Sequence, residues 1–293
     1  MNSVRLIPFA LALLWGFNWP AVKAGLSEVP PFALRMIGLG VGAIILAGVA
    51  AAMGRSMRIE RRSWWPLLVA GTLNIAVFNL ATVFAQINTS TSRAAILTFT
   101  TPLWAIVFAY LFLGEKLDRP RGLALVIGIG GIGMLAAPLL TGGAGSLGLI
   151  FPMIAAVGWA AGTVYQKSHP IAGDRMVATA YQLLIASAVS GIGFVLAGEN
   201  LPQTVSPHVA AAVAFHVIGG TAIAYLLWFI QLDRLSVGAA SLTTFAIPVV
   251  GVLSAMALVG DRPTPLDYVG FAAVLAAAAV AMFAARPKPA PPG

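Results

Sequence analysis

Long apolar runs, separated by short polar or basic segments, make up most of this chain. They occupy residues 4–25, 31–54, 64–88, 92–114, 120–140, 147–168, 175–198, 208–232, 236–259 and 265–285. A helix that rises about 1.5 Å per residue needs about 20 residues to cross a hydrocarbon layer of about 30 Å. The pattern therefore predicts an all-α integral membrane protein with ten transmembrane helices.

Two stretches half a chain apart resemble each other. Residues 94–121 and 240–267 each carry threonines, then a proline, then a long apolar run that ends in glycine and an acid. The prolines, Pro102 and Pro248, are 146 positions apart. Such a spacing indicates an internal duplication, and five spans per half is an odd number, so the second half should enter the membrane from the opposite side. We expect two inverted five-helix repeats.

This duplication divides the chain into four segments. The first repeat, helices 1 to 5, should occupy residues 1–140, and the second, inverted repeat, helices 6 to 10, residues 147–285. The sequence TGGAGS at 141–146 has the composition of a flexible linker. Residues 286–293 would form a cytoplasmic tail.

The amino-acid composition is that of a membrane protein, and the placement of its charges argues against nucleic acid as a partner. Of 293 residues, 59% are hydrophobic and 9% charged, whereas a soluble domain carries about 25% charged residues. The net charge of +8 would suggest nucleic acid in a soluble protein. Here the basic residues lie between apolar runs, mostly on one side of the predicted membrane, where they set orientation. We expect both termini in the cytoplasm, the lipid bilayer as surroundings, and no nucleic acid.

The acidic residues are absent from the interior of the predicted spans. All of them fall in connections or at span ends: Glu28, Glu60, Glu115, Asp118, Asp174, Glu199, Asp233, Asp261 and Asp267. Intramembrane carboxylates are the usual groups for relaying protons or binding organic cations. Their absence favours a neutral or zwitterionic solute. No catalytic residue, metal site or cofactor is expected, and the chain should not be an enzyme. The GxGxxG match at 128–133 lacks a preceding strand, so close helix packing explains it better.

The chain resembles the drug/metabolite transporter superfamily, EamA type. The resemblance rests on ten spans in two inverted repeats, the proline-to-acid fourth span of each half, and the motifs LLWGFNW at 13–19 and ALR at 33–35. Within the superfamily the chain is most similar to YddG-type aromatic amino-acid exporters. The resemblance implies a basket of helices in the bacterial inner membrane, with spans 1–4 and 6–9 around a central cavity and spans 5 and 10 outside it.

Polar and aromatic residues inside the spans are the candidate substrate-binding groups. His216 is the ionisable residue placed deepest in a span, which suits contact with a substrate or a proton; a neutral histidine bonded to the backbone is the alternative. Asn79, Thr82 and Gln86 share one face of span three at helical spacing, whereas Asn74 should point elsewhere, toward a neighbouring helix. The side-chain amides of Asn79 and Gln86 could form hydrogen bonds between helices instead of lining the cavity. The full candidate set is Trp15, Asn18, Asn79, Gln86, Trp159, Thr163, Tyr181 and His216.

Three further residues carry expectations about motion and charge. Pro102 and Pro248 each remove a backbone donor and can bend a helix, so we expect hinges in spans four and nine. Arg35, near the outer end of span two, should extend to the membrane surface; contact with a substrate carboxylate is the alternative.

These features together predict a secondary transporter. It would export small zwitterionic metabolites, in particular aromatic and apolar amino acids, by alternating access. Another solute, such as a nucleoside, a sugar derivative or a drug, would share the same features. A membrane enzyme or a scaffold without transport is a more distant alternative. Proton coupling stays open, and so does the choice between a monomer and a homodimer built on the small residues of spans five and ten.

Overall fold

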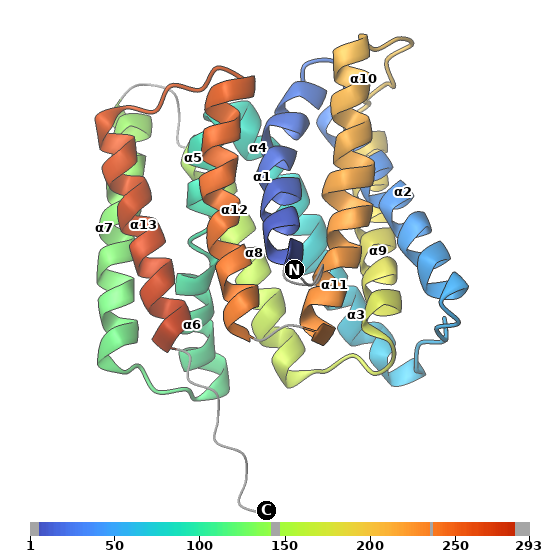
Figure 1. Ribbon diagram of the computed structural model, residues 1–293, viewed down its shortest axis with the longest axis horizontal. Coiled ribbons are helices and arrows are strands. Elements are labelled where there is room, and N and C mark those ends of the chain that lie inside the picture. Colours follow the sequence, from blue (N-terminus) through green and yellow to red (C-terminus); the bar gives the residue numbers. More distant parts are fainter. Residues whose placement is uncertain (1–5, 142–146, 235–236, 285–293) are drawn as a thin grey trace, which may run out of the picture.

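The computed structural model describes residues 6–141, 147–234 and 237–284, and the regular elements among them are all helices (Figure 1). The first half contains α1 (Ile7–Gly25), α2 (Pro31–Ala52), η2 (Arg61–Ser63), α3 (Trp64–Ala70), η3 (Gly71–Val77), α4 (Phe78–Asn88), α5 (Thr91–Thr98), α6 (Thr101–Leu113) and α7 (Arg119–Thr141). The second contains α8 (Leu147–Ser168), α9 (Arg175–Leu196), α10 (Pro207–Ala214), η4 (Phe215–Ile223), α11 (Ala224–Arg234), α12 (Val237–Leu258) and α13 (Pro265–Ala284).

Several helices follow one another without a break and together form the predicted spans. The segment from η2 to α4 is the third span, and α10, η4 and α11 form the eighth. Both contain a π-helix near the middle, η3 and η4. The predicted linker beyond Thr141 and the predicted tail at 286–293 lie outside the described residues.

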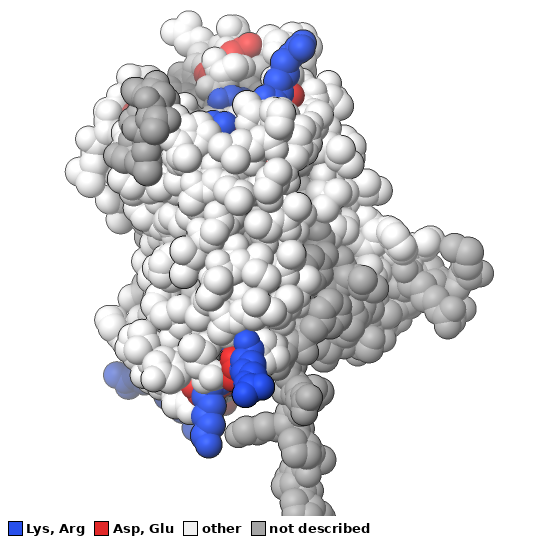
Figure 2. Space-filling view, turned by 90° about the vertical axis from the view of Figure 1, so that its left-hand side faces the viewer, with Lys and Arg blue, Asp and Glu red and all other residues white. Residues whose placement is uncertain are grey.

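A belt of apolar side chains covers the molecule between two charged ends. Leu196 is 82% and Phe112 74% exposed, which suits contact with lipid tails. Figure 2 shows lysine, arginine and acidic residues at the top and bottom of the visible face, with uncharged residues between them. Among the described residues, eight helices are long and apolar enough to cross a membrane. The chain is a multi-pass membrane protein, and the number ten stays a prediction.

The contacts between helices repeat when the two halves are exchanged. α2 packs on α9, and α7 packs on α13, each of which joins equivalent spans. α1, the first span, packs on α12, the ninth. In the same way α8, the sixth span, packs on α5 and α6, which form the fourth. The third span contacts α8 and α9, and the eighth span contacts α1 and α2. This exchange is what a pseudo-twofold relation between two repeats requires.

The pair α7 and α13 stands at one side of the molecule (Figure 1). Gly128 and Gly131 lie so close to Leu103 and Val274 that a methyl group at either glycine would meet those side chains. Gly130, by contrast, has open space around it. Part of the glycine run therefore serves close packing within the chain, in agreement with the packing interpretation of the GxGxxG match.

Ion pairs join different spans at both ends of the molecule. We call the end with the connections 53–63, 114–118 and 169–174 the basic end, because it carries Arg55, Arg58, Arg61, Arg62, Lys116, Arg119, Arg121, Lys167 and Arg175. At the opposite end, acidic residues join different spans. Asp267 binds both Nε (2.6 Å) and Nη2 (3.0 Å) of Arg93, and Asp261 accepts from the Ser92 backbone N–H (2.7 Å). Glu199 accepts from the backbone N–H groups of Phe32 and Ala33.

Candidate functional site

A cavity of about 390 Å³ lies between the third, sixth, seventh and eighth spans. Its wall mixes amide, hydroxyl and aromatic side chains, and Pro170, Ile171 and Arg175 place its mouth at the basic end. The lining also includes Asn74, Ile75, Trp159, Thr163, Gln166, Ala178, Thr179, Gln182, Tyr225 and Trp228. Among the described residues of this wall there is no carboxylate. A few polar groups on an apolar wall are typical of a small-molecule site.

Asn74 is the most connected polar residue of the wall. Its Nδ2 donates to the backbone oxygen of Trp159 (2.8 Å) and to the Thr163 hydroxyl (3.2 Å), and its Oδ1 accepts from Gln166 Nε2 (2.7 Å). Asn74 thus joins the third span to α8, as its expected orientation toward a neighbouring helix suggested. It fixes three groups of the cavity wall in place.

The position of Asn74 depends on local backbone geometry. Asn74 lies in the π-helix η3, where each turn holds more residues than in an α-helix. The opposing position on α8 is Gly162, and a methyl group there would overlap the Asn74 amide. The amide therefore approaches the α8 backbone only because the facing residue is glycine.

A second polar cluster lies buried on the other side of the molecule's centre. Arg35 on α2 contacts Nε2 of His216 (3.4 Å) and donates to the Thr82 hydroxyl (3.1 Å). The other ring nitrogen of His216, Nδ1, is 2.8 Å from Asn18 Oδ1. Arginine has no acceptor, so Nε2 of His216 must accept and Nδ1 must carry the hydrogen that Asn18 receives. His216 is thereby neutral.

This cluster repeats the Asn74 arrangement with the partners exchanged. Asn18 on α1 faces Gly220 of η4, where a methyl group would overlap the Asn18 amide. Asn18 and Gly162 are 144 positions apart, and Asn74 and Gly220 are 146 apart. The same contact between helices therefore occurs in both halves. The asparagine comes from the first span in one case and from the third span in the other.

The structure distributes the predicted binding residues over several places. Trp159 and Thr163 line the cavity, while Asn18 and His216 belong to the buried cluster. Trp15 stands behind the cavity wall, with its ring centre 5.9 Å from that of Tyr225 and 5.6 Å from that of Trp228.

The other three predicted residues do not line the described cavity. Asn79 bonds to the backbone of its own helix at Ile75. Gln86 is buried toward the opposite end, where its backbone oxygen accepts from Lys23. Tyr181 donates to the backbone oxygen of Met57 (3.3 Å) and stacks edge-on against Trp64.

The structure differs from the sequence interpretation at two points. Arg35 does not extend to the surface, because its side chain is covered by the eighth span and by α4 and the residue is 3% exposed. Asn74, Gln166, Thr179 and Gln182 line the cavity but were outside the candidate set. The signal available for them was their shared position toward the basic half of their spans.

The two predicted hinge prolines differ in their surroundings. The fourth span is interrupted at residues 99–100, directly before Pro102, where Thr100 and Thr101 donate their hydroxyls to the Leu97 and Thr98 carbonyls. Pro248 lies inside the continuous helix α12. Of these two equivalent spans, the fourth is broken before its proline and the ninth is continuous through its proline.

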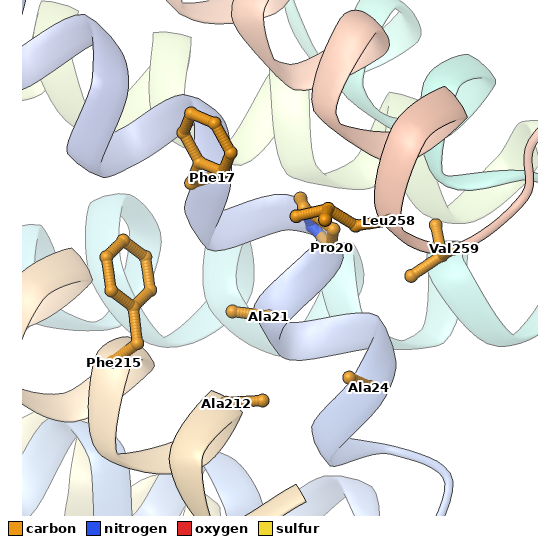
Figure 3. Close-up of a pocket in the computed structure, with 8 residues that line it drawn as sticks. All are labelled: Phe17, Pro20, Ala21, Ala24, Ala212, Phe215, Leu258 and Val259. Atoms are coloured by element: carbon orange, nitrogen blue, oxygen red, sulfur yellow. The ribbon is translucent and has the colours of Figure 1, made fainter. Parts of the chain in front are cut away.

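A second hollow, of about 290 Å³, lies between α1, the α10 to η4 segment and the end of α12 (Figure 3). Phe17, Pro20, Ala21 and Ala24 come from α1, and the rest of the lining is Ala212, Phe215, Leu258 and Val259. None of these side chains carries a polar atom. The hollow can hold apolar groups but offers no side chain to orient a charged or zwitterionic solute.

Comparison with known proteins agrees with this architecture. The model of the EamA-like transporter family matches residues 4–137 and 146–283. The uncharacterized inner membrane transporter YedA of Escherichia coli (strain K12) is 29% identical over 99% of this chain and 97% of its own. A "probable terminal-alkyne amino-acid exporter" of Streptantibioticus cattleyicolor is 24% identical over 87% of this chain and 85% of its own.

One solved crystal structure shares the fold. It aligns with a TM-score of 0.66 and 22% identity, over 97% of this chain and 98% of its own. Both halves of the chain match the family model, and the helices, cavity and exchanged contacts fit a two-repeat membrane transporter. The chain belongs to the EamA-like transporter family of the drug/metabolite transporter superfamily.

Proposed function

We propose that this transporter exports small zwitterionic metabolites, in particular amino acids with aromatic or apolar side chains. The observation that carries the proposal is the wall of the cavity. It offers amide and hydroxyl groups from Gln166, Thr179 and Gln182 beside the rings of Trp159 and Trp228, with no carboxylate among its described residues. Amides and hydroxyls can bond both charged groups of a zwitterion, and aromatic faces attract an ammonium group. A dication would lack a counter-charge there.

The resemblance to a probable amino-acid exporter supports this substrate class. That relative covers most of both chains at 24% identity. YedA, as an inner membrane transporter, supports placement in the bacterial inner membrane. Under the positive-inside rule the basic end, and with it both termini, would face the cytoplasm. The cavity would then open toward the compartment from which an exporter collects its substrate.

Alternating access is the proposed mechanism. In the present conformation the cavity opens at the basic end, and Arg93 and Asp267 form an ion pair at the opposite end. Exchange of the contacts between the two halves would close one end and open the other. The break before Pro102 and the bend available at Pro248 would let the fourth and ninth spans follow this motion.

The test is uptake of labelled amino acids into liposomes that contain the purified protein, with and without a pH gradient. We expect saturable uptake that phenylalanine, tryptophan or leucine inhibits. The response to the gradient decides between proton coupling and facilitated diffusion. Inhibition by nucleosides, sugar derivatives or drugs, with no effect of any amino acid, would remove the amino-acid proposal and leave the transporter architecture in place.

A further inference from the structure

Arg35 is a cation that points into the membrane. It belongs to the second turn of α2, at the opposite end of the molecule, and is 3% exposed. Its guanidinium group contacts His216, nine residues into the eighth span from Pro207. At 1.5 Å per residue this is about 14 Å along the helix axis. The side chain therefore extends toward the middle of the hydrocarbon layer, away from the surface it could have reached.

No protein anion balances this charge within the described part of the chain. The contacts of the guanidinium are the neutral His216 ring and the Thr82 hydroxyl, and its Nε–H is buried without a hydrogen-bond partner. Two acids at the same end as Arg35 are bound elsewhere: Glu28 to Ser206 and Glu199 to the start of α2. A buried charge is costly unless it is paired. The site thus lacks one anionic group.

Tyr225 connects this cation to the cavity. It lines the cavity wall and belongs to the same span as His216, whose ring contacts Arg35. The Trp15 ring packs edge-on against Tyr225 at 5.9 Å between ring centres. The eighth span therefore carries both a residue of the cavity wall, Tyr225, and the histidine that contacts the guanidinium group.

We propose that Arg35 binds the carboxylate of the transported solute. The Nε–H and a neighbouring Nη–H form one side of a planar fork, which matches the two oxygens of a carboxylate. His216 and Thr82 hold the fork in orientation from its other side. The carboxylate would pass Tyr225 to reach it, and the solute side chain would remain among the cavity aromatics. This subsite deepens the proposed function and rests on it for the zwitterionic nature of the solute.

The first test uses the unmodified protein and needs no variant to fold. Binding of L-phenylalanine, 3-phenylpropionate, L-phenylalaninamide and phenethylamine to the purified protein is followed by thermal shift and tryptophan fluorescence. We expect the two carboxylates to bind at least about tenfold more tightly than the amide and the amine. Equal affinities for acid and amide, or no binding of any carboxylate, would overturn the subsite.

Variants then ask whether Arg35 is the residue responsible. Arg35→Gln should raise the half-saturating concentration of L-phenylalanine roughly 10- to 100-fold and leave that of phenylalaninamide unchanged. Arg35→Lys, which keeps the charge but loses the fork, should fall between. Arg58→Gln is the matched control, because it removes an exposed positive charge at the basic end, outside the cavity lining, and it should leave both affinities unchanged. If Arg35 only holds helices together, Arg35→Gln should weaken acid and amide equally.

The outcomes separate this subsite from the proposed function. Amino-acid uptake in Arg35→Gln with an unchanged preference for acid over amide would overturn the subsite and leave amino-acid export intact. Arg35-dependent binding of 3-phenylpropionate, without uptake of any amino acid, would uphold the subsite and remove the amino-acid proposal.

Discussion

Gly162 should be essential for packing the third span against α8, and a single methyl group there is the perturbation to make. In Gly162→Ala, the added carbon would lie about 2.6 Å from Asn74 Cγ, a distance that real side chains do not adopt. The Asn74 amide must move away. Three hydrogen bonds, to Trp159, Thr163 and Gln166, depend on its present position.

The expected cost follows from those bonds. Each buried hydrogen bond contributes about 0.5–1.5 kcal/mol, so losing two or three costs about 1–4.5 kcal/mol. We expect the midpoint of thermal unfolding in detergent to fall by roughly 2–10 °C. Gly130→Ala is the control, because it makes the same change in a helix at a glycine with open space around it. That variant should be neutral or slightly stabilising, since alanine favours the helix by up to about 1 kcal/mol.

A double-mutant cycle tests the mechanism itself. With Asn74→Ala in place, the clash has no partner, so adding Gly162→Ala should cost nothing further. The coupling energy should be about 1–3 kcal/mol. Additive losses in the double variant, or a Gly162→Ala variant as stable as the Gly130→Ala control, would refute this account of the contact.

Three further predictions concern transport and pH. His216→Ala should lower uptake of the identified substrate about tenfold or more, whereas Trp64→Ala, at equal expression, should leave it unchanged; equal effects would count against the buried cluster. Pro102→Ala should slow exchange more than it weakens binding, and an unaltered exchange rate would remove the hinge. Hydrogen bonds from the Ser206 side chain and backbone lower the pKa of Glu28 below its usual 4.5. The ionised Glu28 carboxylate thus stabilises the folded protein above about pH 4.5, and this contribution is lost as the pH falls through the lowered pKa. Melting curves from about pH 3 to pH 6 should show this loss in the wild type and not in Glu28→Gln.

The fold was largely predictable because it follows from regularities of the sequence. Membrane helices need long apolar runs, and the repeated proline-to-acid stretches revealed the duplication. The spacing of Trp15 and Trp159, 144 positions, also places two equivalent indole rings near the same part of the fold. These signals are periodic or repeated patterns, so they can be recognised in the amino-acid sequence without three-dimensional information.

The candidate site was harder to predict, because burial and register arise only in three dimensions. Arg35 near a span end suggested an extended, hydrated side chain, and nothing local in the sequence shows that the eighth span covers it. The expected face of the third span, with Asn79 and Gln86, assumed a regular α-helix. The π-helix η3 interrupts that regularity, and Asn74 became the residue that holds the wall together.

The paired π-helices also bear on the history of the chain. η3 begins at Gly71 and η4 at Phe215, 144 positions apart, so the two halves carry the same irregularity at the same place. A turn of π-helix holds an additional residue relative to an α-helix, and gaining one at matching sites in two separate halves would require the same event twice. A single gain before duplication accounts for both. On this view the ancestral five-helix unit already had the irregular helix and assembled with an inverted copy of itself.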